Sequence, residues 1–474
     1  MKKMNRVGLM LMSCILVTGL AACGGGNNAA NTNGENAPAN APANTPANAP
    51  ADEPAANATT DNKPAEDNAA AEETIKKELA GRTIKISAWW DGTPKPDSDS
   101  SIARIAKTKE VEAKYGVKIE YVNVPFDQYQ AKFTTTVLAG QPFADIVRLQ
   151  YDWALVASLK DQLLKLNDYT NIDDSKLFGK AYPLKGEDYG FDGKNPINDQ
   201  GVFYNRDLFK KLGLTDPQEI FDQGNWTWDT FEDLAKKATQ DTNNDGKPDT
   251  YGWSGWNFET AQFLIASNGS AVSDDVEGKE MISDPKTIEA LDFLNKMYNV
   301  DHVVKVKKGD VNNWEERVTF GDGDVAMTYA FGWLNGEYKG KKIDYGYVPF
   351  PKGPQATDYV NPVTGGGHAW FIPKGVKNPD LVMKIYEEIN DIPTKEEYPG
   401  QEWLEQIVNT PKDIELIQGM AGKVRFMNFT AYPGFPFADF VGEVTKNKVP
   451  AATAAEKFKQ PAQAAMDKIL KAAQ

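Results

Sequence analysis

The sequence has few of the residues on which metal proteins and thiol enzymes depend. Only two of its 474 residues are cysteine and only two are histidine. Cys14 and Cys23 both lie near the N-terminus, so the rest of the chain can form no disulfide and offers no thiol nucleophile. His302 and His368 are far apart in sequence and show no zinc-ligand spacing. Stability must therefore come from an apolar core.

Two common motifs of phosphate binding and hydrolysis are also missing. No G-x-x-x-x-G-K-S/T loop occurs, and GWSG at 252–255 departs from the G-x-S-x-G nucleophile elbow. The glycines at 365–367 are better suited to a hinge, or to close approach of backbone to a ligand, than to a phosphate cradle. The sequence therefore offers no catalytic residues of these kinds.

Positive charge is scarce relative to negative charge. The chain has 52 Lys and Arg against 67 Asp and Glu, a net charge of −15. An acidic surface disfavours nucleic acid, anionic lipid headgroups and polyanionic ligands, so we expect a neutral or cationic ligand and no nucleic-acid partner. The alternative is that the acidity only keeps an exposed protein soluble.

The N-terminus has the pattern of a secretory signal. Basic residues precede an apolar run at 7–20, which is too short for a comfortable membrane span. The run ends in Leu20-Ala21-Ala22-Cys23, which looks like a bacterial lipobox. We expect residues 1–22 to be the signal peptide and Cys23 to be lipidated, which would anchor the protein to the outer face of the bacterial cytoplasmic membrane. The alternative is an ordinary cleavage site that happens to contain cysteine.

Residues 23–71 form a linker of low complexity. They consist mainly of Gly, Asn, Ala and Pro, with the near-repeat APANAPANTPANAPA. Such a segment buries too little apolar surface to offset its ordering entropy, and its prolines favour extended conformers. The linker is therefore predicted to be a disordered spacer that gives the folded part reach above the membrane.

The first part of the folded chain alternates strands and helices. About 390 residues follow the linker, too many for one domain, so two lobes are expected. Apolar periodicity predicts strands at 83–88, 117–124 and 144–149, and helices at 102–115, 126–139 and 153–159. This alternation is typical of a parallel sheet covered by helices, in which ligands bind beyond the carboxyl ends of the strands.

A second lobe begins at Gly201 by the same logic. The strand 201–204 leads into a helix that Asn205 and Asp207 can cap and that Gly213 ends. Thr227 is expected to be the N-cap of the next helix, without a full capping box because the third position holds Thr230 rather than Glu. Further along, helices are predicted near 260–267 and 285–299 with a hairpin between them, a strand at 324–328, and a C-terminal helix near 454–470.

Several stretches resemble one protein family. VFYNRDLFKKLGL at 202–214 and NWTWDTFEDLAKKAT at 225–239 resemble a signature of family 1 extracellular solute-binding proteins, the carbohydrate-binding branch of ABC importers. GDGDVAMTYAFGW at 321–333, YGYVPFPKGP at 345–354 and VTGGGHAWFIPKGVKNPDL at 363–381 follow in the family's order. The resemblance covers the chain from about Thr83 to the C-terminus.

The resemblance implies a two-lobed α/β fold of the periplasmic-binding-protein kind. Each lobe would be a mostly parallel sheet with flanking helices, joined by a multi-segment hinge. Lobe 1 would comprise 72–199 and 349–388, and lobe 2 would comprise 200–348 and 389–474. The protein would be a monomer that captures a carbohydrate, expected to be an oligosaccharide, in the cleft between the lobes and delivers it to ABC permease subunits, and not an enzyme.

Other functions stay open. An anchored glycoside hydrolase would also be acidic and rich in Trp, but it needs two carboxylates about 5 to 10 Å apart across a cleft. A binding protein for a non-sugar solute is compatible with the same fold. A purely structural surface protein would bind no small ligand in a fixed ratio.

Candidate ligand contacts lie at predicted strand ends and in the family motifs. Aromatic rings can bury the flat C–H faces of sugars, and polar side chains can bind the hydroxyls. Trp333 matches the Trp that packs on the sugar in the family's motif, although any single Trp could instead be a core residue. The expected ligand-binding residues are Trp89, Trp90, Asp91, Gln150, Tyr151, Asp152, Trp256, Asn257, Trp333, His368, Tyr432 and Phe435.

One loop resembles a calcium site. Residues 241–249 match the first nine positions of an EF-hand loop, but the twelfth is Gly252 rather than Glu, so Glu259, another side chain or water would have to complete the shell. Some family members carry a similar structural calcium loop. The alternative is a solvated turn. The expected ligands of a structural Ca²⁺ are Asp241, Asn243, Asp245, the Lys247 carbonyl and Asp249.

Overall fold

A computed structural model describes the chain from residue 72 to residue 471, apart from short gaps at 185–186, 195–196, 307–308, 312, 335–337, 339–340, 342, 364–366 and 394–395. The predicted signal peptide, the lipidated Cys23 and the linker lie outside the described residues and stay predictions. In the described part, no helix has both the length and the apolar character needed to cross a membrane.

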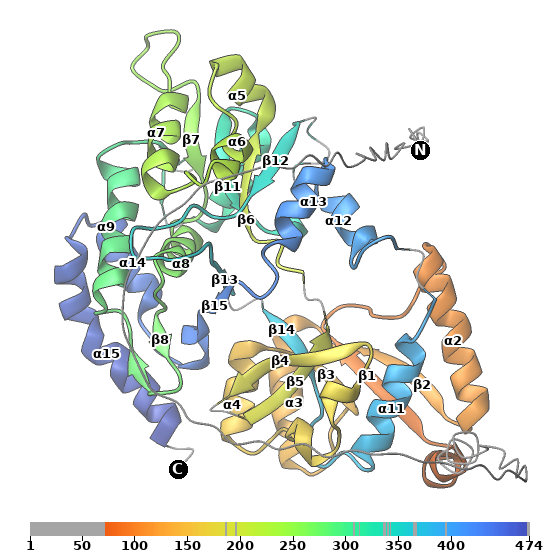
Figure 1. Cartoon of the computed structure of the whole chain (residues 1–474). Coiled ribbons are helices and arrows are strands. Elements are labelled where there is room, and N and C mark those ends of the chain that lie inside the picture. The colour runs from red at the N-terminus through yellow and green to blue at the C-terminus, as the bar shows by residue number, and fades with distance from the viewer. Residues whose placement is uncertain are drawn as a thin grey trace, which may run out of the picture. The chain divides into compact units, whose positions relative to one another are not determined.

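The first lobe is built on a six-stranded sheet with the order β2-β1-β3-β14-β5-β4 (Figure 1). β2, β1 and β3 run parallel, whereas β14 pairs antiparallel with both β3 and β5, and β4 pairs antiparallel with β5. The strands are β1 Thr83–Ala88, β2 Lys118–Asn123, β3 Ile146–Gln150, β4 Phe178–Leu184, β5 Glu187–Gly193 and β14 His368–Phe371.

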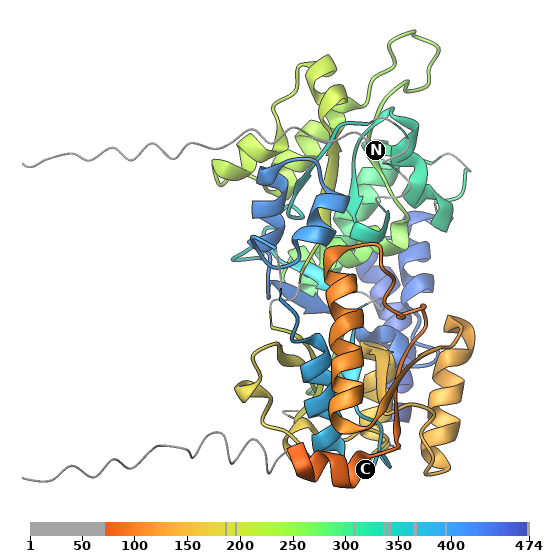
Figure 2. The same cartoon turned by 90° about the vertical axis from the view of Figure 1, so that its right-hand side faces the viewer.

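Helices pack on both faces of this sheet because alternate strand residues point to opposite sides. Ile146 of β3 belongs to one core cluster with residues of α2 and α11, and Val147 belongs to another with residues of α3 and α4. α2 lies alongside α11 in both views of the molecule (Figures 1 and 2). These helices are α2 Asp99–Tyr115, α3 Phe126–Leu138, α4 Tyr151–Leu159 and α11 Pro379–Asn390.

The second lobe is built on a five-stranded sheet with the order β10-β7-β11-β6-β12. β10, β7 and β11 run parallel, and β6 pairs antiparallel with β11 and β12. Every residue of β6, β11 and β12 is buried, which fits strands that are covered on both faces. The strands are β6 Gly201–Asn205, β7 Tyr251–Ser254, β10 Val304–Lys305, β11 Val325–Ala330 and β12 Tyr345–Val348.

The helices of the second lobe come from two parts of the chain. The first part supplies α5 Arg206–Leu212, α6 Pro217–Asp222, α7 Trp228–Ala238, α8 Asn257–Ser267 and α9 Pro285–Asn299. The second supplies α12 Gln401–Ile407, α13 Pro411–Gln418, α14 Phe437–Thr445 and α15 Ala451–Lys471, which packs along α9 (Figures 1 and 2). Two small sheets complete the lobe: the antiparallel pair β8 Ser273–Asp274 and β9 Lys279–Glu280, and the parallel pair β13 Asn361–Val363 and β15 Val424–Phe426.

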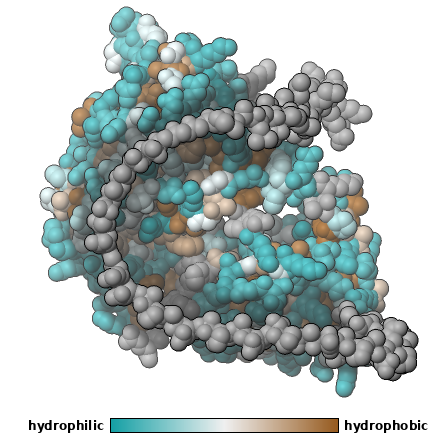
Figure 3. All heavy atoms as spheres, in the orientation of Figure 1, coloured by the Kyte–Doolittle hydropathy of each residue, from teal (hydrophilic) through white to brown (hydrophobic). Residues whose placement is uncertain are grey.

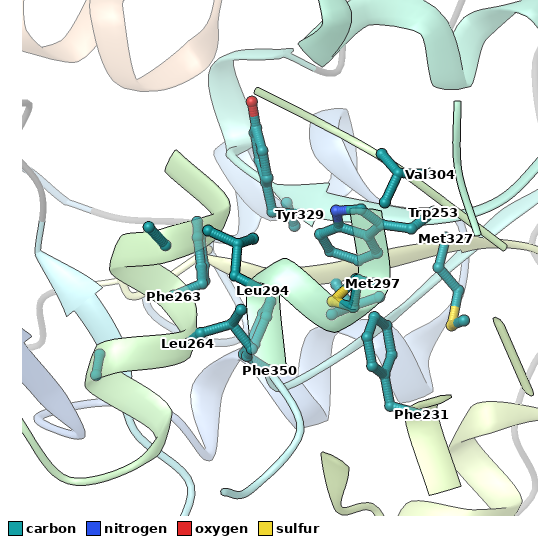
Figure 4. Close-up of a cluster of buried hydrophobic side chains, with 14 of the residues drawn as sticks. Phe231, Trp253, Phe263, Leu264, Leu294, Met297, Val304, Met327, Tyr329 and Phe350 are labelled. Carbon is teal, nitrogen blue, oxygen red and sulfur yellow. The ribbon is translucent and has the colours of Figure 1, made fainter. Parts of the chain in front are cut away.

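The core of the second lobe is rich in aromatic rings. Trp253 of β7 is fully buried and lies close to Phe231, with ring centroids 5.2 Å apart at a steep angle, and Met297 lies beside it in Figure 4. Phe263 of α8 stacks on Tyr329 of β11 at 5.5 Å. Such aromatic pairs stabilise the packing of helices on the sheet by more than the burial of their surface area alone. The visible surface, by contrast, is mostly hydrophilic (Figure 3).

The structure confirms the predicted fold class and refines its details. The parallel arrangement holds for β2, β1 and β3 in the first lobe and for β10, β7 and β11 in the second, but both sheets are mixed because β14 and β6 run against their neighbours. The capping expectation for α7 was too strict, since the Thr227 N–H donates to Thr230 Oγ1 at 2.9 Å and Thr230 supplies the bond usually made by Glu.

The chain passes between the two sheets three times in its described part. It leaves the first sheet after β5, returns at β14 and leaves again after α11. Phe350, which follows β12, still packs in the core of the second lobe. The residue limits predicted for the lobes stay predictions.

Candidate ligand-binding site

Three of the predicted residues meet at one edge of the six-stranded sheet. Trp89 and Trp90 follow the carboxyl end of β1, and His368 begins β14, where it pairs with Gln150 at the end of β3. The ring centroids of Trp89 and Trp90 lie 5.3 and 5.6 Å from that of His368. The antiparallel insertion of β14 beside β3 therefore brings a residue from far along the chain to the strand-end edge.

The two tryptophans at this edge have different surroundings. Trp89 is half-buried and makes edge contacts with Phe126, Tyr129 and Trp153 at 5.7, 5.8 and 5.7 Å. Trp90 is 40% exposed, although its ring lies 5.0 Å from that of Trp89. Trp89 thus packs on the aromatic rings of the first lobe, and the ring of Trp90, which contacts Trp89, is exposed to solvent.

His368 is held by a buried arginine. Arg148 of β3 donates from Nε to His368 Nδ1 at 2.8 Å and pairs through Nη2 with Asp192 of β5 at 2.6 Å. Burial, and secondly the charge of Arg148, lowers the pKa of His368 to about 4. Sequence reasoning missed Arg148 and Asp192, and the only local signal was an arginine within the apolar strand ADIVRL.

The residues that follow β3 face a different neighbour. The Tyr151 ring meets Phe426 of β15 edge to face at 5.2 Å, and burial raises the pKa of its hydroxyl to about 12. Asp152 is 6% exposed and accepts from the Trp153 N–H at 2.9 Å. Burial raises the pKa of the Asp152 carboxyl, and a hydrogen bond from Thr430 partly offsets this rise.

Asp91 and Gln150 are both more accessible to solvent than Asp152. Asp91 is exposed, accepts from the Thr93 N–H at 3.1 Å and pairs with Lys95 at 3.2 Å. Its hydrogen bonds from Thr93 and then from Lys95 lower the pKa of its carboxyl. Gln150 is half-buried at the end of β3. Asp91 follows β1 and Gln150 ends β3, so both residues lie at the strand-end edge that carries Trp89, Trp90 and His368.

The second sheet has its own aromatic edge. Trp256, which follows β7, stacks on Phe258 at 4.6 Å, and its backbone N–H donates to the Tyr329 hydroxyl at 3.2 Å. Asn257 is 1% exposed, donates to Thr445 Oγ1 at 2.8 Å and accepts from the Phe258 N–H at 2.8 Å. Both ends of its amide are thus engaged inside the second lobe.

A turn after β11 brings together two residues that sequence reasoning missed. Gly332 approaches Asp199 so closely that a Cβ would lie 2.0 Å from Asp199 Oδ2. The same oxygen accepts from Trp403 Nε1 at 3.1 Å, and Trp403 is 37% exposed. Trp333 lies in this turn, but its side chain is outside the described residues. No local pattern distinguished Trp403 from the other tryptophans.

Tyr432 and Phe435 pack in a buried cluster that also includes Leu155 of α4 in the first lobe. Tyr432 is 1% exposed, and its hydroxyl donates to Asp275 Oδ1 at 2.7 Å. Asn428 Nδ2 donates to the other oxygen of Asp275 at 2.6 Å. Phe435 is half-buried, with its ring 6.4 Å from that of Tyr432. The Tyr432 hydroxyl therefore has an internal structural bond.

The calcium-like loop is exposed and closed by its own side chains. Asp241 accepts from the Gly246 N–H at 2.8 Å, Asn243 Nδ2 donates to Asp249 Oδ1 at 3.0 Å, and Asp245 accepts from the Lys247 N–H at 2.9 Å. Gly246 has the left-handed backbone, with φ of 85°, that the sharp turn requires. Among the described residues, no group of three or more His, Cys, Asp or Glu side chains could hold a metal.

Comparison with known proteins identifies the family. Residues 93–387, more than half of the chain, match the family model described as bacterial extracellular solute-binding protein. The chain belongs to this family. Its described site therefore lies in a member of an extracellular solute-binding family.

Three proteins illustrate the similarity of this solute-binding protein to its relatives. A maltooligosaccharide ABC transporter solute-binding lipoprotein of Streptococcus pneumoniae is 25% identical over 63% of this chain and 70% of its own. The crystal structure of Mycobacterium tuberculosis UspC aligns with a TM-score of 0.61 at 18% identity, over 81% and 100% of the two chains. The GacH receptor of Streptomyces glaucescens, solved with and without acarbose, aligns with a TM-score of 0.56 at 17% identity, over 82% of this chain and 98% of its own.

Proposed function

We propose that this solute-binding protein captures a neutral oligosaccharide and delivers it to the permease of an ABC importer. The observation that carries the proposal is the exposed ring of Trp90, held in place by Trp89 beside the uncharged His368. A fixed aromatic surface with few charges suits the C–H face of a sugar ring. The name of the pneumococcal relative and the acarbose complex of GacH support the same ligand class.

The second lobe would contact the side of the sugar that faces away from the first lobe. Trp256 and Trp403 are partly exposed at the carboxyl-end side of the second sheet, where the turn holding Trp333 also lies. Three chain passages between the lobes form a hinge that would let them close on a bound sugar. The loaded form would then dock on the permease as a monomer, tethered through lipidated Cys23 to the outer face of the membrane.

The proposal is tested by measuring thermal stability in the presence of neutral oligosaccharides, with a product assay on each sugar that binds. The first sugars are α-1,4-linked glucose oligomers, followed by other neutral oligosaccharides and by glycerol phosphate. A rise in melting temperature with a sugar that is recovered intact supports capture for transport. Cleavage of the sugar would mean a hydrolase, and stabilisation by glycerol phosphate alone would mean a different solute.

Replacement of Trp90 by alanine is expected to weaken binding of the sugar about tenfold, or about 1.4 kcal/mol, because the ring's contact area is lost. The melting temperature of the free protein should hardly change, since Trp90 is 40% exposed. Trp90→Phe retains an aromatic surface and is the matched control. Unchanged affinity in Trp90→Ala, measured by calorimetry, would remove Trp90 from the site.

We also propose a structural Ca²⁺ in the loop 241–249. The residue types support the proposal, because Asp241, Asn243, Asp245 and Asp249 carry carboxylate and amide oxygens and the Lys247 carbonyl adds another. In the described structure these side chains bond within the loop, so the ion would replace some of those hydrogen bonds. The loop connects α7 to β7, so bound Ca²⁺ would fix the spacing between these two elements of the second lobe.

Removal of Ca²⁺ with a chelator is therefore expected to lower the melting temperature by a few degrees, and added Ca²⁺ should restore it. Asp245→Asn should abolish this dependence on Ca²⁺. Asp233→Asn, which alters an exposed carboxylate on neighbouring α7, should retain it. Equal melting curves with chelator and with Ca²⁺ would show that the loop is an ordinary turn.

A further inference from the structure

The contact between Arg148 and His368 determines where the imidazole carries its proton. Two guanidinium nitrogens of Arg148, Nε and Nη2, lie 2.8 and 2.6 Å from His368 Nδ1. A guanidinium is always charged and can only donate hydrogen bonds. Nδ1 must therefore be the unprotonated nitrogen that accepts, and the single proton of the neutral ring must reside on Nε2.

Arg148 itself is held from three sides. Its Nη2 pairs with Asp192 Oδ2 at 2.6 Å and donates to the His368 carbonyl at 3.3 Å. Its guanidinium also lies 4.9 Å from the centre of the Trp370 ring, within the range of a cation–π contact. The Arg148 side chain is 9% exposed, so these contacts leave it little freedom. The geometry at Nδ1 is thus imposed by the sheet.

The opposite nitrogen has a different environment. Among the described residues, no group accepts a hydrogen bond from His368 Nε2. The imidazole is half-buried, and its centroid lies 5.6 Å from that of the exposed Trp90. The site therefore contains a directional imidazole N–H next to its aromatic surface, and this N–H lacks an internal partner in the described structure.

We propose that Asp192 and Arg148 position His368 as an uncharged Nε2–H donor to a hydroxyl or ring oxygen of the sugar that lies against Trp90. His368 is then a specificity-determining residue, and Arg148 and Asp192 are positioning residues that act through it. The inference rests on the proposed sugar-binding function. It narrows the ligand at this position to a hydrogen-bond acceptor and disfavours an ammonium group, which can only donate.

The charges around His368 are compatible with a neutral ring. Arg148 on β3 and Asp192 on β5 are the charged groups that face it, and the phenol groups of Tyr151 on α4 and Tyr386 on α11 lie within the electrostatic reach of that pair. Burial raises the pKa of both phenols, so they stay neutral across the physiological range. The adjoining Trp89 and Trp90 carry no charge. The ring should accordingly keep one protonation state from pH 5 to pH 8.

The proton position can be measured by nitrogen-15 NMR of the labelled protein. The chain has only two histidines, and His302→Gln identifies the signals of His368. We expect His368 to show the Nε2–H tautomer and no titration between pH 5 and pH 8. An Nδ1–H tautomer, or a titration midpoint inside this range, would overturn the inference.

Variants at Arg148 separate positioning from mere packing. Arg148→Met fills similar space but cannot donate, so His368 should show a mixture of tautomers and should begin to titrate within the measured range. If this variant does not fold, Arg148→Gln makes the same test, because an amide can face either tautomer. Persistence of a single Nε2–H tautomer in the folded variant would show that Arg148 does not position the ring.

Variants at His368 test the donor itself. Asn can accept from Arg148 as Nδ1 does but cannot reach the position of Nε2, so His368→Asn should weaken sugar binding about tenfold with little change in melting temperature. Gln reaches the Nε2 position, so His368→Gln should recover part of the affinity. In the His368→Asn background, Arg148→Met should have little further effect on affinity.

The outcomes distinguish this inference from the proposed function. If the wild-type protein binds a sugar and His368→Asn binds it equally well, the donor role is wrong and the sugar-binding function stands. If the wild-type protein binds no sugar, the proposed function fails and the donor role fails with it. The NMR measurement on the free protein reports on Arg148 in both cases.

Discussion

Replacement of Asp413 by alanine is expected to lower the free energy of unfolding by about 3–5 kcal/mol. Asp413 is fully buried at the start of α13. Its Oδ1 accepts from Arg206 Nη2 at 2.7 Å, Gln218 Nε2 at 2.7 Å and the Tyr347 N–H at 2.9 Å. Its Oδ2 accepts from the N–H and the hydroxyl of Thr410 at 3.0 and 2.8 Å.

The large effect is expected because the alanine variant would leave the hydrogen-bond donors around Asp413 without their acceptor. Asp413 is the carboxylate that links α13 to α6 and to the edge strand β12, and it neutralises Arg206, whose side chain is only 17% exposed. Losing one member of a buried charge pair costs far more than losing a surface pair, because the remaining charge stays desolvated.

Glu415→Ala on the same helix is the matched control. Glu415 pairs with Lys412 at 3.3 Å, but its side chain is 71% exposed, so the expected loss is below about 1 kcal/mol. Both variants would be compared by denaturant unfolding monitored by circular dichroism. Similar midpoints for the two variants would contradict the assignment of Asp413 as the central residue of this network.

Replacement of Trp253 by alanine is the second large effect, with an expected loss of about 3–5 kcal/mol. Trp253 is fully buried between α7 and α9, where it contacts the ring of Phe231 and lies beside Met297 (Figure 4). The alanine variant would leave a cavity in a core whose strands β7, β10 and β11 are hydrogen-bonded to one another, which limits how far the cavity can collapse. Denaturant unfolding measures the loss, and Trp253→Phe, which refills most of the space, should recover much of it.

The two tryptophan substitutions should separate stability from binding. Trp253→Ala should unfold more readily, and any folded fraction should bind sugar with nearly normal affinity, because the residue lies in the core. Trp90→Ala should show the opposite pattern. If Trp253→Ala were as stable as the wild-type protein, the packing described for the second lobe would be wrong.

Most elements of the fold follow from local signals. The glycines at 116 and 213 end α2 and α5 in the left-handed conformation, and Asn205 caps α5 by accepting from the Leu208 N–H. These effects act within a few residues, so a single sequence shows them. The position of β14 is different. Its four residues enter the middle of the first sheet opposite partners about 220 positions away, and no periodicity reveals such pairing.

The same distinction between local signals and long-range pairing applies to the residues of the candidate site. The rule that ligands bind at strand ends found Trp89 and Trp90, a stretch of the family resemblance supplied His368, and the structure brings these three together. It could not find Arg148 and Asp192, because they meet only once β14 lies between β3 and β5. Internal hydrogen bonds, such as that of Asn257 to Thr445, likewise depend on tertiary packing rather than on residue type.

The central place of β14 also sets the order in which the two sheets can form during synthesis. All five strands of the second sheet lie between Gly201 and Val348, so that sheet has its full set of strands before His368 has been made. Until then the first sheet exists as two pieces, β2-β1-β3 and β5-β4, and the facing edges of β3 and β5 have no partner. Open edges of this kind invite pairing with other chains. The lobe whose synthesis begins first is therefore the one whose sheet closes last.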